Sequence, residues 1–152
     1  MNYWYINTEA KAFDGESPHK KWLKHGRAFV SGVEGADAEK FAGKLQQLQR
    51  GDVIFMYANT QGIMAVGLVL ERCDGQPSNP PLVYCWPRHT EERLQEYQAK
   101  VDWFLRFPHN AIAPHTLRAI IGWTSPQAIQ GIPNHEAAKA LLEQAHQQAR
   151  AE

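Results

Sequence analysis

The stretch GDVIFMYANTQGIMAVGLVLE, residues 51–71, is the feature that most limits how this chain can fold. Two apolar runs flank a short polar turn that ends in Gly62, a residue type that adopts positive φ at little cost. This arrangement predicts a β-hairpin. Neither run alternates cleanly, which indicates strands buried on both faces and favours a closed barrel over an open sheet. Gly67, inside the second run, is expected to mark a bulge or bend where a barrel turns a corner.

Two further segments predict strands. Residues 3–7, YWYIN, are aromatic or β-branched, as strand residues commonly are. Residues 100–108 alternate, so that Val101 and Trp103 share one face while Asp102 lies on the other. The second pattern predicts a strand with one buried face.

Helical spacing and capping residues predict helices elsewhere. Phe41, Leu45 and Leu48 recur at i, i+4 and i+7, and Gly51 stands where a helix C′ glycine is expected. Further helices are expected over residues 90–98, from an N-cap at Ser125 to Gly131, and from Asn134 onward. Residues 8–26 are expected to form a loop or an irregular turn of helix. Together these segments predict an α+β fold with mostly antiparallel strand pairing.

Composition places the chain among ordinary globular domains. Its 152 residues, 43% hydrophobic and 21% charged, fit a single domain over residues 1–152. The 16 basic and 16 acidic residues give a net charge of zero, which excludes a strongly basic coat for nucleic acid but leaves room for a local patch. The N-terminus lacks the features of a secretory signal, and no apolar run is long enough to span a bilayer. We therefore expect a cytoplasmic protein with no membrane segment.

Motifs for common catalytic chemistry are missing from the sequence. It has no P-loop, no G-x-S-x-G, no G-x-G-x-x-G and no H-E-x-x-H. Seven histidines are scattered without metal-ligand spacing, and Cys73 and Cys85 stand too far apart for a zinc-finger pair. We expect a reduced pair of cysteines, no metal, no cofactor and no catalytic nucleophile.

The stretch HKKWLKHGR, residues 19–27, carries the strongest signal for binding. Lys20, Lys21, Lys24 and Arg27 surround Trp22. Cations can hold phosphates while an aromatic ring stacks on a base, so the stretch is a candidate for nucleic-acid contact. The competing interpretation is a solvated loop whose tryptophan folds back onto the core.

Tryptophans and small polar residues offer candidates for a binding pocket. Trp22 and Trp86 lie in predicted loops and suit the walls of an aromatic slot, whereas Trp103 lies on a predicted strand and fits a core position as well. Asn7, at the end of the first predicted strand, either caps a turn or offers its amide to a base edge. Ser31-Gly32 either exposes backbone N–H groups to a ligand or simply forms a turn.

The order of these segments resembles the EVE branch of the PUA-like superfamily, which also contains the YTH and ASCH domains. The hairpin pattern from Gly51 to Val69 carries most of the likeness, and the VDW strand at 101–103 adds to it. The likeness extends from about residue 3 to residue 125, which is most of the chain.

The resemblance implies a small closed pseudo-barrel of mostly antiparallel strands flanked by helices. One side of such domains carries a pocket for a flipped or single-stranded modified base, which is a modified cytosine in EVE-like domains attached to restriction nucleases and methylated adenine in YTH domains. The residues that would lie at this pocket are Asn7, Trp22, Phe29, Ser31, Gly32 and Trp103. The basic residues Lys20, Lys21, Lys24 and Arg27 would bind phosphate.

We therefore predict a non-enzymatic module that recognises methylated cytosine or adenine in DNA or RNA, or a nucleotide-like small molecule, in bacterial or phage restriction and defence. Any cleavage would require a separate nuclease partner. One alternative is a small RNA- or nucleotide-processing enzyme of the ASCH type, with Lys21 or His25 as acid or base. The other is a protein-interaction module, whose mark would be a large exposed apolar patch.

Overall fold

The computed structural model describes residues 1–8, 16–84, 94–124 and 127–152. The chain divides into two compact units. The first unit comprises Met1–Glu9, Gly51–Leu68 and Trp103–Glu152, and the second comprises Ala10–Arg50 and Val69–Asp102. Each unit contains strands, helices and buried apolar side chains of its own.

The predicted hairpin lies at the centre of the first unit. It consists of β3 (Val53–Ala58) and β4 (Gly62–Glu71), which pair antiparallel. Gly62 adopts φ 108°, as the turn requires. An added Cβ at Gly62 would also overlap the carbonyl oxygen of Ile112, whose backbone is bridged to Ile63. The hairpin prediction is confirmed, and Gly62 serves both the turn and this close approach.

The irregularity in the hairpin lies at a different residue from the one expected. Met56 pairs with Ala65 and Tyr57 with Ile63, so Met64 is the extra residue of a bulge. Gly67 pairs in regular register with Ile54. The bulge predicted at Gly67 is therefore wrong, since it lies at Met64.

Two more strands complete the first unit's pairing. β1 (Tyr3–Asn7) runs parallel to β3, with Tyr3 opposite Val53. β6 (Ile129–Gly131) pairs antiparallel with residues Trp4 to Ile6 of β1. The helix expected between Ser125 and Gly131 is therefore wrong from residue 127 onward, since residues 127 and 128 form a bend and residues 129–131 form β6. Residues 125 and 126 lie outside the described part of the chain. Pairing with β1 outweighed the local helical signal at 129–131.

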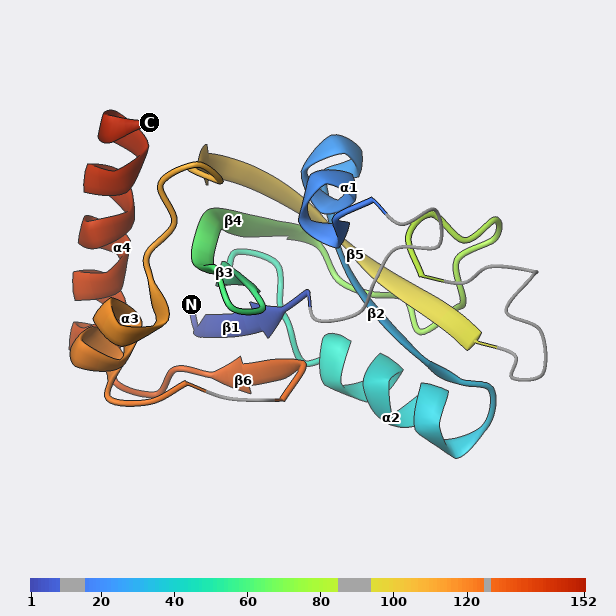
Figure 1. Ribbon diagram of the computed structural model, residues 1–152. Coiled ribbons are helices and arrows are strands. Elements are labelled where there is room, and N and C mark those ends of the chain that lie inside the picture. The colour runs from blue at the N-terminus through green and yellow to red at the C-terminus, as the bar shows by residue number, and fades with distance from the viewer. Residues whose placement is uncertain (9–15, 85–93, 125–126) are drawn as a thin grey trace. The chain divides into compact units, whose positions relative to one another are not determined.

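Two helices flank this core. α3 (Pro114–Ile121), which the sequence analysis did not predict, and α4 (His135–Ala151) lie side by side (Figure 1). The predicted last helix is confirmed, since the Asn134 side chain accepts a hydrogen bond from the Ala137 N–H as an N-cap does. The helices and strands enclose one apolar cluster, whose largest members include Tyr5, Phe55, Phe107, Leu117 and Leu141.

The second unit is built on an antiparallel pair of strands with two helices. α1 (Pro18–His25) replaces the loop or irregular helical turn expected at this position, and it ends at Gly26 in the left-handed conformation, φ 63°. β2 (Arg27–Val33) follows directly and pairs with β5 (Leu94–Arg106). α2 (Ala36–Leu45) then packs on β2 (Figure 1).

Two boundaries in this unit differ from the sequence-based expectation. Residues 94–98 form the start of β5, not the end of a helix, because β2 pairs with them all the way to Leu94; residues 90–93 lie outside the described part. α2 ends at Leu45, so Leu48 is buried beyond the helix and Gly51, at φ 91°, is not its C′ residue. The half-buried strand at 100–108 is confirmed, with Val101, Trp103 and Phe107 buried and Lys100, Asp102 and Arg106 exposed.

Six strands in the described part of the chain pair in the order β2-β5-β4-β3-β1-β6. β4 and β5 each contribute residues to both units. Only the β1–β3 pair is parallel among the four strand pairs whose direction is given by their register. Mixed helices and mostly antiparallel strands confirm the α+β class. No helix among the described residues is long and apolar enough to cross a membrane.

Candidate functional site

The basic stretch of residues 19–27 forms α1 and the start of β2, and its cations fall into two groups. Lys20 and Lys24, one helical turn apart, are exposed. Lys21, predicted to bind phosphate with them, is 8% exposed, and its ammonium lies 3.9 Å from a carboxylate oxygen of Glu16. Arg27 is half-buried on β2. Helical geometry therefore leaves Lys20 and Lys24 open to solvent and turns Lys21 inward.

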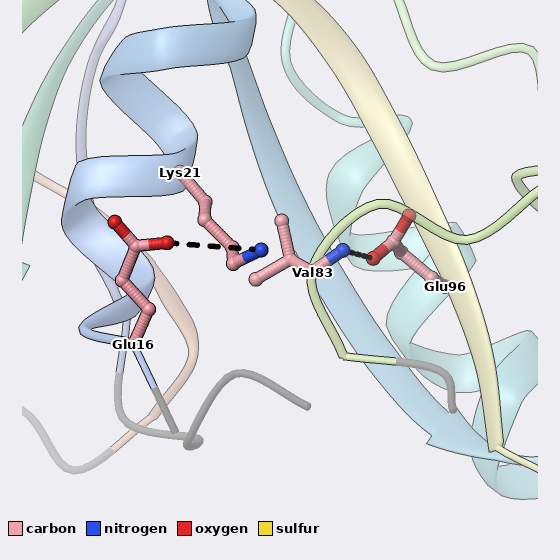
Figure 2. A network of polar contacts seen from close by, with 4 residues as sticks. All are labelled: Glu16, Lys21, Val83 and Glu96. Atoms are coloured by element: carbon pink, nitrogen blue, oxygen red, sulfur yellow. Dashed lines mark hydrogen bonds and ion pairs between the residues drawn. The ribbon is translucent and has the colours of Figure 1, made fainter. Parts of the chain in front are cut away.

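A second buried charge lies in the same unit. Glu96, 1% exposed on β5, accepts hydrogen bonds from three successive backbone N–H groups, those of Leu82, Val83 and Tyr84, at 2.7–2.9 Å. Figure 2 shows Lys21 with Glu16, and Val83 with Glu96. Charge-assisted bonds of this kind are what make a buried carboxylate tolerable. Sequence reasoning missed Glu96, because it was assigned to a predicted helix.

The aromatic residues beside α1 are sealed. Trp22 has no exposed surface, and its indole N–H donates to the hydroxyl oxygen of Tyr84 at 2.9 Å. Its ring centroid lies 6.0 Å from that of Phe29, which is 1% exposed. Trp22 therefore packs in the core of the second unit rather than standing open as a pocket wall in this structure. Trp86 lies outside the described residues.

Two histidines of α1 have a lowered pKa. Burial lowers the pKa of His19 below its usual 6.5, and the neighbouring Lys20 adds to the effect. Burial also lowers the pKa of His25, with further contributions from Lys24, Arg27 and Lys21 that exceed the opposing effect of Glu96. The cations around α1 therefore lower the pKa of both imidazole rings, in addition to the effect of burial.

Ser31-Gly32, a candidate for backbone contacts to a ligand, lies where α2 packs on β2. Ser31 is half-buried. A Cβ on Gly32 would lie 2.9 Å from the Cα of Ala38, closer than real Cβ contacts come. A glycine at position 32 is therefore explained by packing, because the absence of a side chain lets α2 approach β2 closely.

The remaining pocket candidates belong to the first unit. Trp103 is 2% exposed on β5. Asn7, the last residue of β1, is 7% exposed, and its side-chain Oδ1 is buried with no hydrogen-bond partner among the described residues. Its backbone N–H donates to Ala128 O, and the next residue, Thr8, donates to Tyr57 O. The strand end is therefore fixed by backbone bonds, while one amide oxygen meets no donor among the residues that the structure describes.

A polar cavity of about 310 Å³ lies within the second unit. The cations Arg27, Arg72 and Lys100 line it together with the carboxylates of Glu71 and Asp74. Gln98, also in its wall, donates from Nε2 to the Ser78 hydroxyl oxygen at 2.8 Å, and its Oε1 is buried without a partner among the described residues. The volume of this cavity is at the lower end of the range for small-ligand sites, roughly 300–1,000 Å³.

The described residues hold no cluster of His, Cys, Asp and Glu side chains suited to a metal ion. Cys73 is a buried free thiol, and burial raises its pKa, which lowers its reactivity. Cys85 lies outside the described part of the chain.

No protein-family model and no curated protein sequence matches the chain. Several solved structures, however, are similar to this chain. Human THYN1, in a complex with DNA containing 5-methylcytosine, superposes with a TM-score of 0.55 at 12% identity, over 95% of this chain and 98% of that one. The YTH domain of Zygosaccharomyces rouxii MRB1, in a complex with N6-methyladenosine RNA, gives a TM-score of 0.53 at 13% identity, over 94% of this chain and 86% of that one.

A Pseudomonas syringae protein gives a TM-score of 0.54 at 18% identity, over 94% of this chain and 99% of that one. At these identities the likeness concerns the fold. This likeness agrees with the resemblance carried by the hairpin and the VDW strand. The chain therefore has the α+β, PUA-like fold of the EVE and YTH type.

Proposed function

We propose that this protein binds nucleic acid and recognises a modified base, methylated cytosine or adenine, without altering it. The fold supports the proposal, because human THYN1 and a yeast YTH domain share it and were each solved with a methylated nucleic acid. The residues that we propose for contact with the base are those named from the sequence, Asn7 and Trp103 in the first unit, and Trp22, Phe29, Ser31 and Gly32 in the second.

The observation that carries the proposal is the buried amide oxygen of Asn7. An acceptor buried without a hydrogen bond costs about 1–3 kcal/mol. Most buried polar side-chain atoms of native proteins have a hydrogen-bond partner, and each exception calls for an explanation, of which a functional role is one. The N–H groups on a base edge are the kind of donor that an Asn oxygen accepts in nucleic-acid recognition. A bound base would thus recover a free energy that the free protein leaves unused.

Phosphate contacts are proposed for the exposed cations Lys20 and Lys24 and for Arg27. Lys21 would contribute only if it left Glu16, so we expect it to matter less than its neighbours. Trp22 has no exposed surface, so stacking a base on it would require the surrounding chain to open. One stacked base is worth about 1–3 kcal/mol and each phosphate contact is salt-sensitive, so weak and salt-dependent binding is expected.

The test compares single-stranded oligonucleotides that differ only in 5-methylcytosine, N6-methyladenosine or neither, at two salt concentrations. We expect one modified strand to bind at least fivefold more tightly than its unmodified counterpart, and all binding to weaken as salt rises. Equal affinity for modified and unmodified strands would rule out recognition of either modification.

Asn7→Ala tests the carrying observation. We expect the variant to lose the preference for the modified base while its unfolding temperature stays the same or rises, because a buried group without a donor has been removed. Asn59→Ala, at an exposed position in the β3–β4 turn, makes the same change elsewhere and should alter neither property. An Asn7→Ala variant that kept the full preference would remove Asn7 from the site.

A second candidate function is catalysis on a nucleotide or RNA, as in the ASCH-type interpretation. The observation in its favour is the Lys21 ammonium, buried beside Glu16. Product formation that is lost in Lys21→Ala and kept in Lys20→Ala would support it. We further propose that any cleavage of bound DNA or RNA belongs to a separate nuclease partner.

A further inference from the structure

The polar cavity of the second unit is a site that the proposed base pocket does not use. It is bounded by the first residue of β2, the end of β4 with the loop that follows it, and the middle of β5. Its three cations come from three different segments of the chain: Arg27 from β2, Arg72 from the loop after β4, and Lys100 from β5.

Two of these cations face each other. Arg27 and Lys100 are direct partners in the antiparallel ladder of β2 and β5. Directly opposite residues of such a ladder have Cβ atoms about 5 Å apart, and like charges in that position destabilise the sheet. An anion between the two side chains would convert this repulsion into attraction.

The described lining of the cavity contains fewer carboxylates than cations. Glu71 pairs with Lys100 at 3.9 Å, but both side chains are more than half exposed, and exposed pairs contribute little. Arg72 donates to the carbonyl oxygen of Gln46 at 2.7 Å, a neutral acceptor that leaves its charge in place. Asp74 Oδ1 already accepts the backbone N–H of Gln76. Three cations therefore stand against two carboxylates, one exposed and paired and one engaged in a turn.

We infer that this cavity binds a phosphate group, held by Arg27, Arg72 and Lys100. A guanidinium offers a planar fork of N–H donors that matches phosphate oxygens, and a lysine adds a compact charge. The hydroxyl of Ser78, which accepts a bond from Gln98, still has a hydrogen to donate. The inference rests on the proposed function in one respect: the phosphate is taken to be part of a nucleic-acid backbone.

The test uses the double variant Arg27→Gln/Lys100→Gln with two probes, an unmodified single-stranded oligonucleotide and inorganic pyrophosphate. We expect the affinity of the variant for the oligonucleotide to fall at least tenfold at low salt. The plot of log affinity against log salt should become less steep by roughly 0.7 for each lost phosphate contact. The control is Lys40→Gln/Lys139→Gln, which removes the same charge from exposed helix positions and should change the oligonucleotide affinity by less than threefold.

Glu71→Gln provides the opposite change. It removes the carboxylate that competes for Lys100, so we expect oligonucleotide binding to strengthen by roughly two- to fivefold, the scale of an exposed ion pair. Folding is monitored by circular dichroism. The double variant should unfold at the same temperature as the wild type or higher at low salt, because the facing cations are gone.

The outcomes separate this inference from the proposed function. Unchanged binding of both probes in the double variant overturns the inference. Loss of pyrophosphate binding with unchanged oligonucleotide binding overturns its nucleic-acid part and identifies a site for a free phosphate anion. Loss of oligonucleotide binding beyond that of the single variant Arg27→Gln supports the inference, even if no protein distinguishes modified from unmodified strands, in which case only the proposed function fails. A loss no larger than that of Arg27→Gln overturns the inference, because Arg27 alone would then account for it.

Discussion

The two units of this molecule bury different kinds of side chain. The first encloses an apolar cluster of strand and helix residues, and its buried polar residues, among those that the structure describes, are Asn7, Thr8 and Asp52. The second buries Lys21, Glu96 and His19 beside its aromatic rings and holds a cavity lined with charges. Burying a charge is costly unless hydrogen bonds offset the loss of water. Among the described residues, each unit therefore buries three polar side chains, but all three are ionisable in the second unit and only Asp52 is in the first.

Each unit nevertheless fixes its chain with a buried carboxylate. In the first, Asp52 accepts the backbone N–H of Asn2 and the indole N–H of Trp4, at 2.9 and 3.0 Å. In the second, Glu96 accepts three backbone N–H groups of one segment. The same device thus serves different ends: Asp52 attaches the N-terminus and a side chain, whereas Glu96 shapes residues 82–84, including the hydroxyl-bearing Tyr84 that meets Trp22.

The largest effect is expected from removing these carboxylates. Glu96→Ala leaves three buried N–H groups without an acceptor and should lower the free energy of unfolding by about 4 kcal/mol, while Asp52→Ala should lower it by about 2 kcal/mol. Urea unfolding followed by circular dichroism measures both. Glu96→Gln keeps one acceptor oxygen and the side-chain shape, so its loss should be smaller than that of Glu96→Ala. An equal loss in the two alanine variants would contradict the expectation that the loss grows with the number of N–H groups left without an acceptor.

Substituting each of two glycines by alanine should change the stability of the protein by an intermediate amount. Gly32→Ala forces a Cβ to 2.9 Å from the backbone of Ala38 and should cost roughly 1–3 kcal/mol, since α2 must shift away from β2. Gly43→Ala, within α2, meets no atom within 4 Å and should stabilise the protein by roughly 0.5–1 kcal/mol through helix propensity. Thermal unfolding of both variants is the measurement. If Gly32→Ala left the unfolding temperature unchanged, the packing role of Gly32 would be wrong, and contact with a ligand would remain as the reason for a glycine at this position.

The smallest effect concerns pH. His19 and His25 have a lower pKa in the folded protein than their usual 6.5, so the unfolded chain takes up protons first as the pH falls. Stability should be fully present above pH 6.5 and decline as the pH drops through the folded pKa values. His25→Gln should flatten this decline between pH 7.5 and 5.5. His146→Gln, on an exposed position of α4, serves as the control and should leave it as it is in the wild type. A steeper decline in His25→Gln would reverse the assigned sign.

Prediction from sequence succeeded where local pattern and tertiary packing agree. The hairpin of β3 and β4, the alternating face of Val101 and Trp103, and the Asn134 cap of α4 all rest on neighbouring residues. It failed where pairing with a distant strand decided the outcome. Residues 94–98 became part of β5 because β2 lies beside them, and residues 129–131 became β6 because β1 does. Helix propensity is worth a few tenths of a kcal/mol per residue and is readily outweighed by such pairing.

For the candidate sites, the sequence by itself determined which chemical groups are available: a tight cluster of cations around a tryptophan, an asparagine at a strand end, and the PUA-like pattern around the hairpin. Only the tertiary structure decided how those groups are used. It turned Lys21 inward and left Lys20 exposed, sealed Trp22, and set Arg27 across from Lys100 in one cavity. The reason is that exposure and the distance between charges depend on packing and strand register, and these are set by residues far away along the chain.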